Sequence, residues 1–87
     1  MSARILVVDD EANIRALIDE ILSEEGHEVT TAADAKEARA ARKSEDFDLI
    51  LLDIWMPDTD GITLLREWSM TDGYDCPVVM MSGHGTV

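Results

Sequence analysis

Three aspartates stand where two apolar runs end. Asp9 and Asp10 follow the run Ile5-Leu6-Val7-Val8, and Asp53 follows Leu49-Ile50-Leu51-Leu52. A short, continuous apolar run bounded by turn residues is typical of a strand buried on both faces in a parallel sheet. The carboxyl ends of parallel strands meet at one rim, where ligands bind in open α/β sheets. We therefore expect the three carboxylates to converge at that rim.

Converging carboxylates favour a bound divalent cation. Like charges within a few ångströms repel, and a hard cation such as Mg²⁺, which takes oxygen ligands, removes that conflict. No His or Cys adjoins the three aspartates, which disfavours zinc. A carboxylate can also attack phosphorus to form an aspartyl-phosphate, a reaction that depends chiefly on positioning and charge neutralisation. Ser82 follows a later apolar run and is placed to donate its hydroxyl and N–H to a phosphoryl oxygen.

Simpler explanations exist for each of these residues taken alone. An aspartate after a strand often only caps the following helix, and Asp9-Asp10 precedes a segment with helical periodicity. Ser82-Gly83 on its own is more often a turn. The joint placement of acidic and hydroxyl residues at three successive rim positions favours a site over three unrelated local roles.

The elements that must position these residues alternate along the chain. Strands are expected at residues 4–8, 28–32, 49–52 and 78–81, separated by three helices, which gives the rhythm βαβαβαβ of a parallel sheet. The polar sequence Val29-Thr30-Thr31 suggests that the second strand lies at an edge. The fourth strand is apolar throughout and is expected to be an interior strand, although nothing that follows in these 87 residues supplies its second neighbour.

Each helix carries a recognisable signal. The first has an apolar stripe and is expected to stop at Gly26. Asp34, three residues before Glu37, predicts a capping box that opens a second helix ending at about Lys43. Asp60 is expected to cap the third helix. The stripe of the first helix consists of Ile14, Leu17, Ile18, Ile21 and Leu22.

Composition limits the function classes. The 87 residues allow one small domain, and the net charge of -12 argues against direct contact with nucleic acid or an anionic membrane. The chain has no secretory signal, no apolar stretch long enough for a membrane helix, and a single cysteine. A cytoplasmic location is the expectation.

Three motifs span the chain: Val-Val-Asp-Asp-Glu at the beginning, Leu-Leu-Asp-Ile-Trp-Met-Pro-Asp-Thr-Asp-Gly at the centre and Met-Ser-Gly-His-Gly at the end. Together they resemble the receiver domain of two-component response regulators. The closing Ser82-Gly83-His84-Gly85-Thr86-Val87 resembles the NtrC/NtrX branch of that family. The resemblance implies a flavodoxin-like, doubly wound α/β fold with strand order 2-1-3-4-5. Residues 1–87 would form a single receiver domain that lacks the last helix, strand and helix.

The resemblance also implies a role for each site residue. Asp53 is similar to the phosphoacceptor, Asp10 to the direct metal ligand and Asp9 to a ligand acting through water. Trp55 would offer its backbone carbonyl to the metal, and Ser82 would be the switch hydroxyl that contacts the phosphoryl group. The implied cofactor is Mg²⁺, with Mn²⁺ as a substitute.

The implied function is a phosphoryl-accepting signalling module rather than an enzyme, although family members assist their own phosphorylation and dephosphorylation. A sensor histidine kinase would transfer a phosphoryl group to Asp53 and switch a transcriptional regulator that carries ATPase and DNA-binding modules. The phosphate-pairing lysine expected after a fifth strand is absent from these residues, so phosphotransfer and output are expected to be impaired. The exposed edge of the fourth strand predicts a homo-oligomer.

Three other function classes fit less well. A receiver-like interaction or dimerisation domain that is never phosphorylated is the main alternative. A Mg²⁺-dependent phosphatase of the haloacid-dehalogenase type would carry a second aspartate two positions after the nucleophile, where this chain has Trp55. A flavin- or nucleotide-binding module would require small residues after the first strand, where Asp9-Asp10-Glu11 would repel phosphate.

Overall fold

In the part of the chain that the structure describes, four parallel strands form one sheet in the order β2-β1-β3-β4. The computed structural model describes residues 2–53, 61–69 and 76–81. The order agrees with the flavodoxin-like arrangement expected from the sequence, and β2 lies at an edge as its polarity predicted. The elements are β1 (Arg4–Val8), α1 (Ala12–Glu24), β2 (Glu28–Ala32), α2 (Ala35–Ser44), β3 (Leu49–Asp53), α3 (Gly61–Ser69) and β4 (Val78–Met81).

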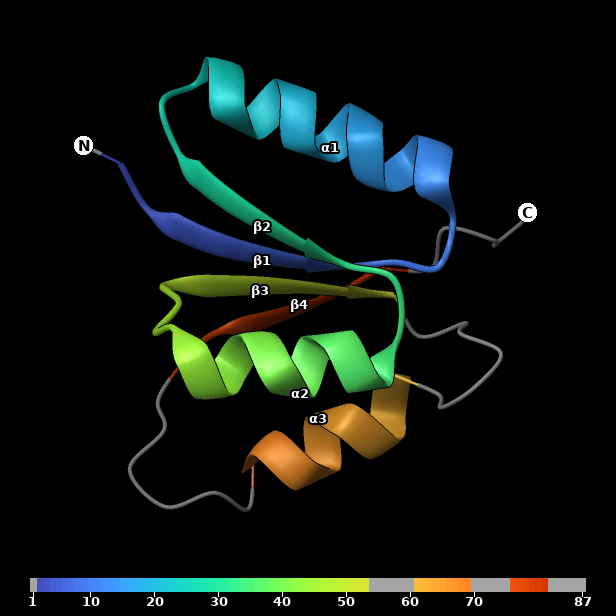
Figure 1. Ribbon diagram of the computed structural model, residues 1–87. Coiled ribbons are helices and arrows are strands. Elements are labelled where there is room, and N and C mark those ends of the chain that lie inside the picture. The colour runs from blue at the N-terminus through green and yellow to red at the C-terminus, as the bar shows by residue number, and fades with distance from the viewer. Residues whose placement is uncertain (1, 54–60, 70–75, 82–87) are drawn as a thin grey trace.

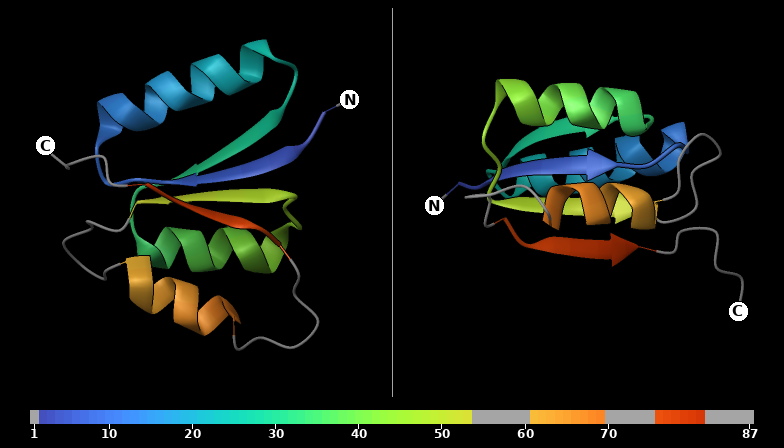
Figure 2. Two further views of the ribbon diagram at one scale, coloured as in Figure 1. Left: turned by 180° about the vertical axis from the view of Figure 1, so that it is seen from behind. Right: turned by 90° about the horizontal axis from the view of Figure 1, so that it is seen from below.

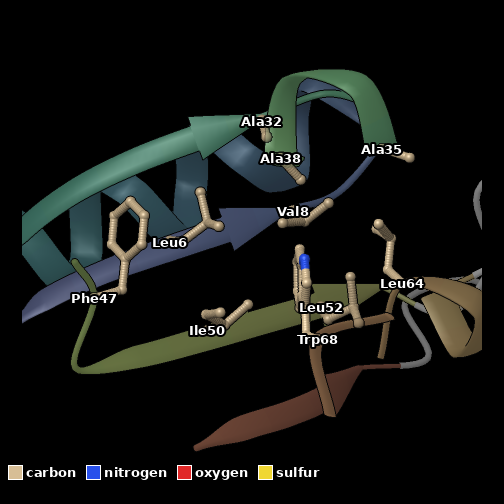
Figure 3. Close-up of a cluster of buried hydrophobic side chains, with 10 residues drawn as sticks. All are labelled: Leu6, Val8, Ala32, Ala35, Ala38, Phe47, Ile50, Leu52, Leu64 and Trp68. Atoms are coloured by element: carbon tan, nitrogen blue, oxygen red, sulfur yellow. The ribbon is translucent and has the colours of Figure 1, made fainter. Parts of the chain in front are cut away.

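The helices cover the two faces of the sheet unequally. Helix α1 lies on one face, whereas α2 and α3 lie together on the other (Figures 1 and 2). The main cluster of buried apolar side chains fills the space between the sheet and the α2/α3 pair (Figure 3). Alternate residues of the two central strands point into it because strand side chains alternate between faces. The cluster consists of Leu6, Val8, Ala32, Ala35, Ala38, Phe47, Ile50, Leu52, Leu64 and Trp68.

The predicted helix boundaries have the expected chemistry. The carboxylate of Asp34 accepts a hydrogen bond from the Glu37 N–H at 2.8 Å, so Asp34 is the N-cap of α2. Glu37 reaches back and accepts from the Ala33 N–H at 2.8 Å, one residue earlier than in the usual capping box. Gly26 has φ of 92°, the left-handed conformation that ends α1. The expected cap of α3, Asp60, lies outside the described residues.

Two contacts join α2 to α3. The guanidinium of Arg39 donates two hydrogen bonds to the carboxylate of Glu67, at 2.7 and 3.2 Å. One turn further along α2, the guanidinium of Arg42 lies 4.6 Å from the centroid of the Trp68 ring. Both pairs therefore connect the same stretch of α2 to the same stretch of α3.

The apolar stripe predicted for α1 is only partly covered in the structure. Ile14, Ile18 and Leu22 are half-buried, whereas Leu17 and Ile21 are 55% and 52% exposed. No residue of α1 is fully buried. The reason is that α1 packs mainly over β2 and β1 at one side of the sheet, which leaves the far side of its stripe without a partner among the described residues.

The fourth strand is at an edge, whereas its apolar sequence predicted an interior position. Within the described part of the chain, β4 pairs with β3 alone. Val79 and Met80 are 48% and 37% exposed, one on each face of the strand. The apolar side chains of β4 therefore lie on surface that the described residues leave uncovered.

Among the described residues, no helix is long and apolar enough to cross a membrane.

Candidate functional site

Asp9 is held at the carboxyl end of β1 by the neighbouring backbone. Its N–H donates to the Ala32 carbonyl at 3.1 Å, which extends the β1–β2 pairing by one step. Its carboxylate accepts a hydrogen bond from the Glu11 N–H at 2.8 Å. The residue is 1% exposed. A buried carboxylate is stable only with compensating partners, and the turn after β1 supplies one of them.

Asp53 occupies the equivalent place on the adjacent strand. It is the last residue of β3, pairs in register with Met81 of β4 and is 0% exposed. Strands β1 and β3 run parallel side by side, so their carboxyl ends reach the same edge of the sheet (Figure 1). The order β2-β1-β3 places the connections that follow β1 and β3 on opposite faces, since α1, which follows β1, and α3, which follows β3, lie on opposite sides of the sheet. This change of side is the topological switch point at which such sheets bind ligands.

The three predicted aspartates meet at this rim. One carboxylate oxygen from each of Asp9, Asp10 and Asp53 lies within 4.8 Å of the others. Asp9 and Asp53 are buried and Asp10 is half-buried. An all-carboxylate donor set with one partly exposed member fits a hard divalent cation that keeps some water ligands, as Mg²⁺ does. The convergence expected from the sequence is therefore confirmed.

N-capping of α1 does not account for Asp9, the first of the two acidic residues after β1. The N-cap of α1 is Glu11, which adopts an extended conformation and makes no capping hydrogen bond with its side chain. Asp9 lies two residues before that position, and its carboxylate accepts from the Glu11 N–H rather than from within the helix. Asp9 is therefore not the N-cap of α1.

Two predicted site residues lie outside the described residues. Neither Trp55 nor Ser82 belongs to residues 2–53, 61–69 or 76–81. Their roles at the metal and at the phosphoryl group stay predictions from the resemblance.

Arg15 is a residue at this site that the sequence interpretation missed. Its guanidinium Nη1 donates to the backbone carbonyl of Asp9 at 2.8 Å, from the first turns of α1. One signal was available in the sequence. A cation near the N-terminus of a helix is electrostatically unfavourable, so an arginine four residues after Glu11 needs a partner outside the helix.

Comparison with known families decides the classification. The family model of the response regulator receiver domain matches residues 5–87. The chain belongs to this family. It is a receiver domain of the two-component response regulators, and its phosphoryl-accepting signalling role follows from that membership.

Individual relatives agree with this family. The transcriptional regulatory protein TcrA of Mycobacterium tuberculosis is 39% identical over 90 residues, which cover 97% of this chain and 33% of TcrA. The crystal structure of NtrX from Brucella abortus in complex with ADP is 50% identical, with a TM-score of 0.89, over 98% of this chain and 20% of that one. TrrA from Thermotoga maritima, solved with Mg²⁺-BeF, is 40% identical, with a TM-score of 0.81, over 93% of this chain and 71% of TrrA.

These matches also show how much of each longer relative the chain covers. It spans about a third of the length of TcrA and a fifth of the NtrX chain. The likeness to NtrX supports the branch suggested by the sequence motifs. The activities of the longer regulators are properties of those proteins, and these matches do not assign them to this chain.

Proposed function

We propose that Asp53 is the phosphoacceptor of this receiver domain and that Asp9 and Asp10 hold the divalent cation that supports its phosphorylation. The observation that carries the proposal is the meeting of the three carboxylates within 4.8 Å at the end of β1 and β3. Asp53 is the last residue of β3, an interior strand, and like Asp9 it is fully buried. Its rigid, water-poor position suits a nucleophile that must be held in one orientation.

The transfer itself needs few protein groups. A carboxylate oxygen of Asp53 would attack phosphorus of a phosphohistidine on a sensor histidine kinase. The new O–P bond forms as the P–N bond breaks, and the histidine leaves with the electron pair of the broken bond. Mg²⁺, or Mn²⁺ in its place, would neutralise charge on the phosphoryl oxygens. Asp10 is proposed as its direct ligand, Asp9 as a ligand through water and Trp55 as a ligand through its backbone carbonyl.

Ser82 and the regulator complete the proposed signalling path. Ser82 would donate its hydroxyl to the phosphoryl group and so report phosphorylation to the rest of the domain. In the longer protein, the response would pass to effector modules for ATP hydrolysis and DNA binding. The domain itself would act in the cytoplasm as a regulatory module, without direct contact to nucleic acid, which its net charge of -12 disfavours.

A mass measurement tests the acceptor assignment. The chain is incubated with acetyl phosphate, with and without Mg²⁺, and its intact mass is recorded. We expect a Mg²⁺-dependent gain of one phosphoryl group that Asp53→Asn abolishes. The matched control is Asp46→Asn, since Asp46 is an exposed aspartate in the connection before β3. A phosphorylated Asp53→Asn variant would disprove the assignment.

The exposed edge of β4 supports a further proposal about assembly. Its outer side has no strand partner among the described residues, and Val79 and Met80 are 48% and 37% exposed. An unpaired, apolar strand edge adds a strand from another molecule readily. We therefore expect self-association through β4, measured by light scattering over a range of concentrations. A monodisperse monomer at all concentrations would contradict it.

A further inference from the structure

We propose that Arg15 is a positioning residue of the metal site, which it supports by holding the backbone of Asp9. The inference rests on the proposed function, because it concerns the same three carboxylates. The contact is a hydrogen bond of 2.8 Å from the Arg15 guanidinium to the Asp9 carbonyl. Arg15 is half-buried, so its guanidinium is turned toward the turn after β1 instead of extending into solvent.

Among the described residues, three hydrogen bonds hold Asp9, and one of these three depends on a remote side chain. Its N–H donates to Ala32 at 3.1 Å and its carboxylate accepts from the Glu11 N–H at 2.8 Å. Both of these bonds use backbone donors, which substitution leaves in place. In the third bond, the Asp9 carbonyl accepts from Arg15. The peptide unit that contains this carbonyl joins Asp9 to Asp10, so Arg15 restrains two of the three carboxylates at once.

The position of Arg15 in its helix strengthens the inference. Arg15 belongs to the first turns of α1, where the partial positive charge of the helix N-terminus disfavours a cation. An arginine there weakens the helix slightly unless its charge is used elsewhere. At the acidic rim, the charge of Arg15 strengthens its hydrogen bond to the Asp9 carbonyl, since a charge-assisted hydrogen bond is stronger than a neutral one.

Two explanations of this contact predict opposite results. If Arg15 acted on the rim only through its charge, its removal would strengthen cation binding, because a positive charge near the site would be lost. If Arg15 positions Asp9 and Asp10, its removal weakens cation binding, as loss of a group that orients metal ligands does. A purely structural role would lower stability and leave Mg²⁺ affinity unchanged.

The experiment measures Mg²⁺ affinity of the whole chain by isothermal titration calorimetry. Arg15→Gln keeps a hydrogen-bond donor at shorter reach but removes the charge, and we expect it to weaken Mg²⁺ binding about tenfold. Arg15→Lys keeps the charge and one donor group and is expected to recover part of the affinity, since lysine reproduces the guanidinium only partly. The matched control is Arg4→Gln, because Arg4 lies at the opposite end of β1 in an exposed ion pair with Glu28.

A second measurement covers the case of a poorly folded variant. The increase in melting temperature caused by saturating Mg²⁺ reports binding to the folded state. We expect this increase to be smaller for Arg15→Gln than for the unmodified chain and Arg4→Gln, with Arg15→Lys between them. Equal or tighter Mg²⁺ binding by Arg15→Gln would overturn the inference and leave the proposed function intact. Absence of Mg²⁺ binding by the unmodified chain would overturn the metal site and this inference together.

Discussion

The guanidinium of Arg42 lies against the face of the Trp68 ring, 4.6 Å from its centroid. The pair connects α2 to α3, and the Trp68 ring is also part of the buried cluster over β3 (Figure 3). Trp68 therefore has two roles, as a core side chain and as the surface on which a cation of α2 rests. Its contribution to stability can be divided between them by substitution.

Trp68→Ala is expected to lower the free energy of unfolding by about 3–5 kcal/mol, because it removes a large, 7% exposed side chain and leaves a cavity. Arg42→Met keeps much of the aliphatic stem but removes the cation, and should cost only about 0.5–2 kcal/mol. Urea unfolding followed by circular dichroism measures both. A larger loss from Arg42→Met than from Trp68→Ala would mean that the cation, and not the buried ring, holds the two helices together.

The Arg39–Glu67 pair is expected to contribute little and to be insensitive to pH near neutrality. Both side chains are more than 40% exposed, and exposed ion pairs are worth about 0–1 kcal/mol. The hydrogen bond that Arg39 donates to the Glu67 carboxylate raises the pKa of Arg39, and desolvation of the guanidinium opposes it. A raised arginine pKa gives stability that is fully present below the usual arginine range and is lost only as pH rises through it. A double-mutant cycle with Arg39→Ala and Glu67→Ala at pH 6 and pH 9 should give the same small coupling at both.

Asp34→Ala should lower the free energy of unfolding by about 1 kcal/mol, since it removes the side chain that caps α2. Asp34→Asn retains an acceptor oxygen and should cost less. Thermal unfolding compares the two variants with the unmodified chain. An equal loss in both would show that the charge at the helix N-terminus, and not the hydrogen bond to the Glu37 N–H, supplies the stabilisation.

Asp10→Asn is expected to change stability and cation binding in opposite directions. Without Mg²⁺, removing one of three carboxylates within 4.8 Å relieves repulsion and should raise the free energy of unfolding by about 1 kcal/mol. The same substitution should weaken Mg²⁺ binding, because it replaces a charged ligand with a neutral one. Melting temperatures in EDTA and in saturating Mg²⁺ measure both effects. A loss of stability in EDTA would show that Asp10 is held mainly by favourable contacts.

The sequence predicted most of this architecture because its strongest signals are local. The apolar runs before Asp9 and Asp53 predicted the two central strands, and Asp34 predicted the start of α2. The sequence did not predict features that depend on which helices and strands lie beside one another. The periodicity of α1 showed an apolar stripe but not that Leu17 would face away from the packed side. Arg15 was missed because its partner is a backbone carbonyl, which no residue type reveals.

The central position of β1 has a consequence for how the domain folds. Strand β1 pairs with two strands that come later in the chain, since Arg4 pairs with Glu28 and Ile5 pairs with Leu49. Pairings between distant parts of a chain form slowly, because each requires closure of a long loop. Asp9 and Asp53 come together only when β1 and β3 have paired. Cation binding at this rim would therefore begin late in folding. The rate at which cation binding appears during refolding would report how fast β1 and β3 pair.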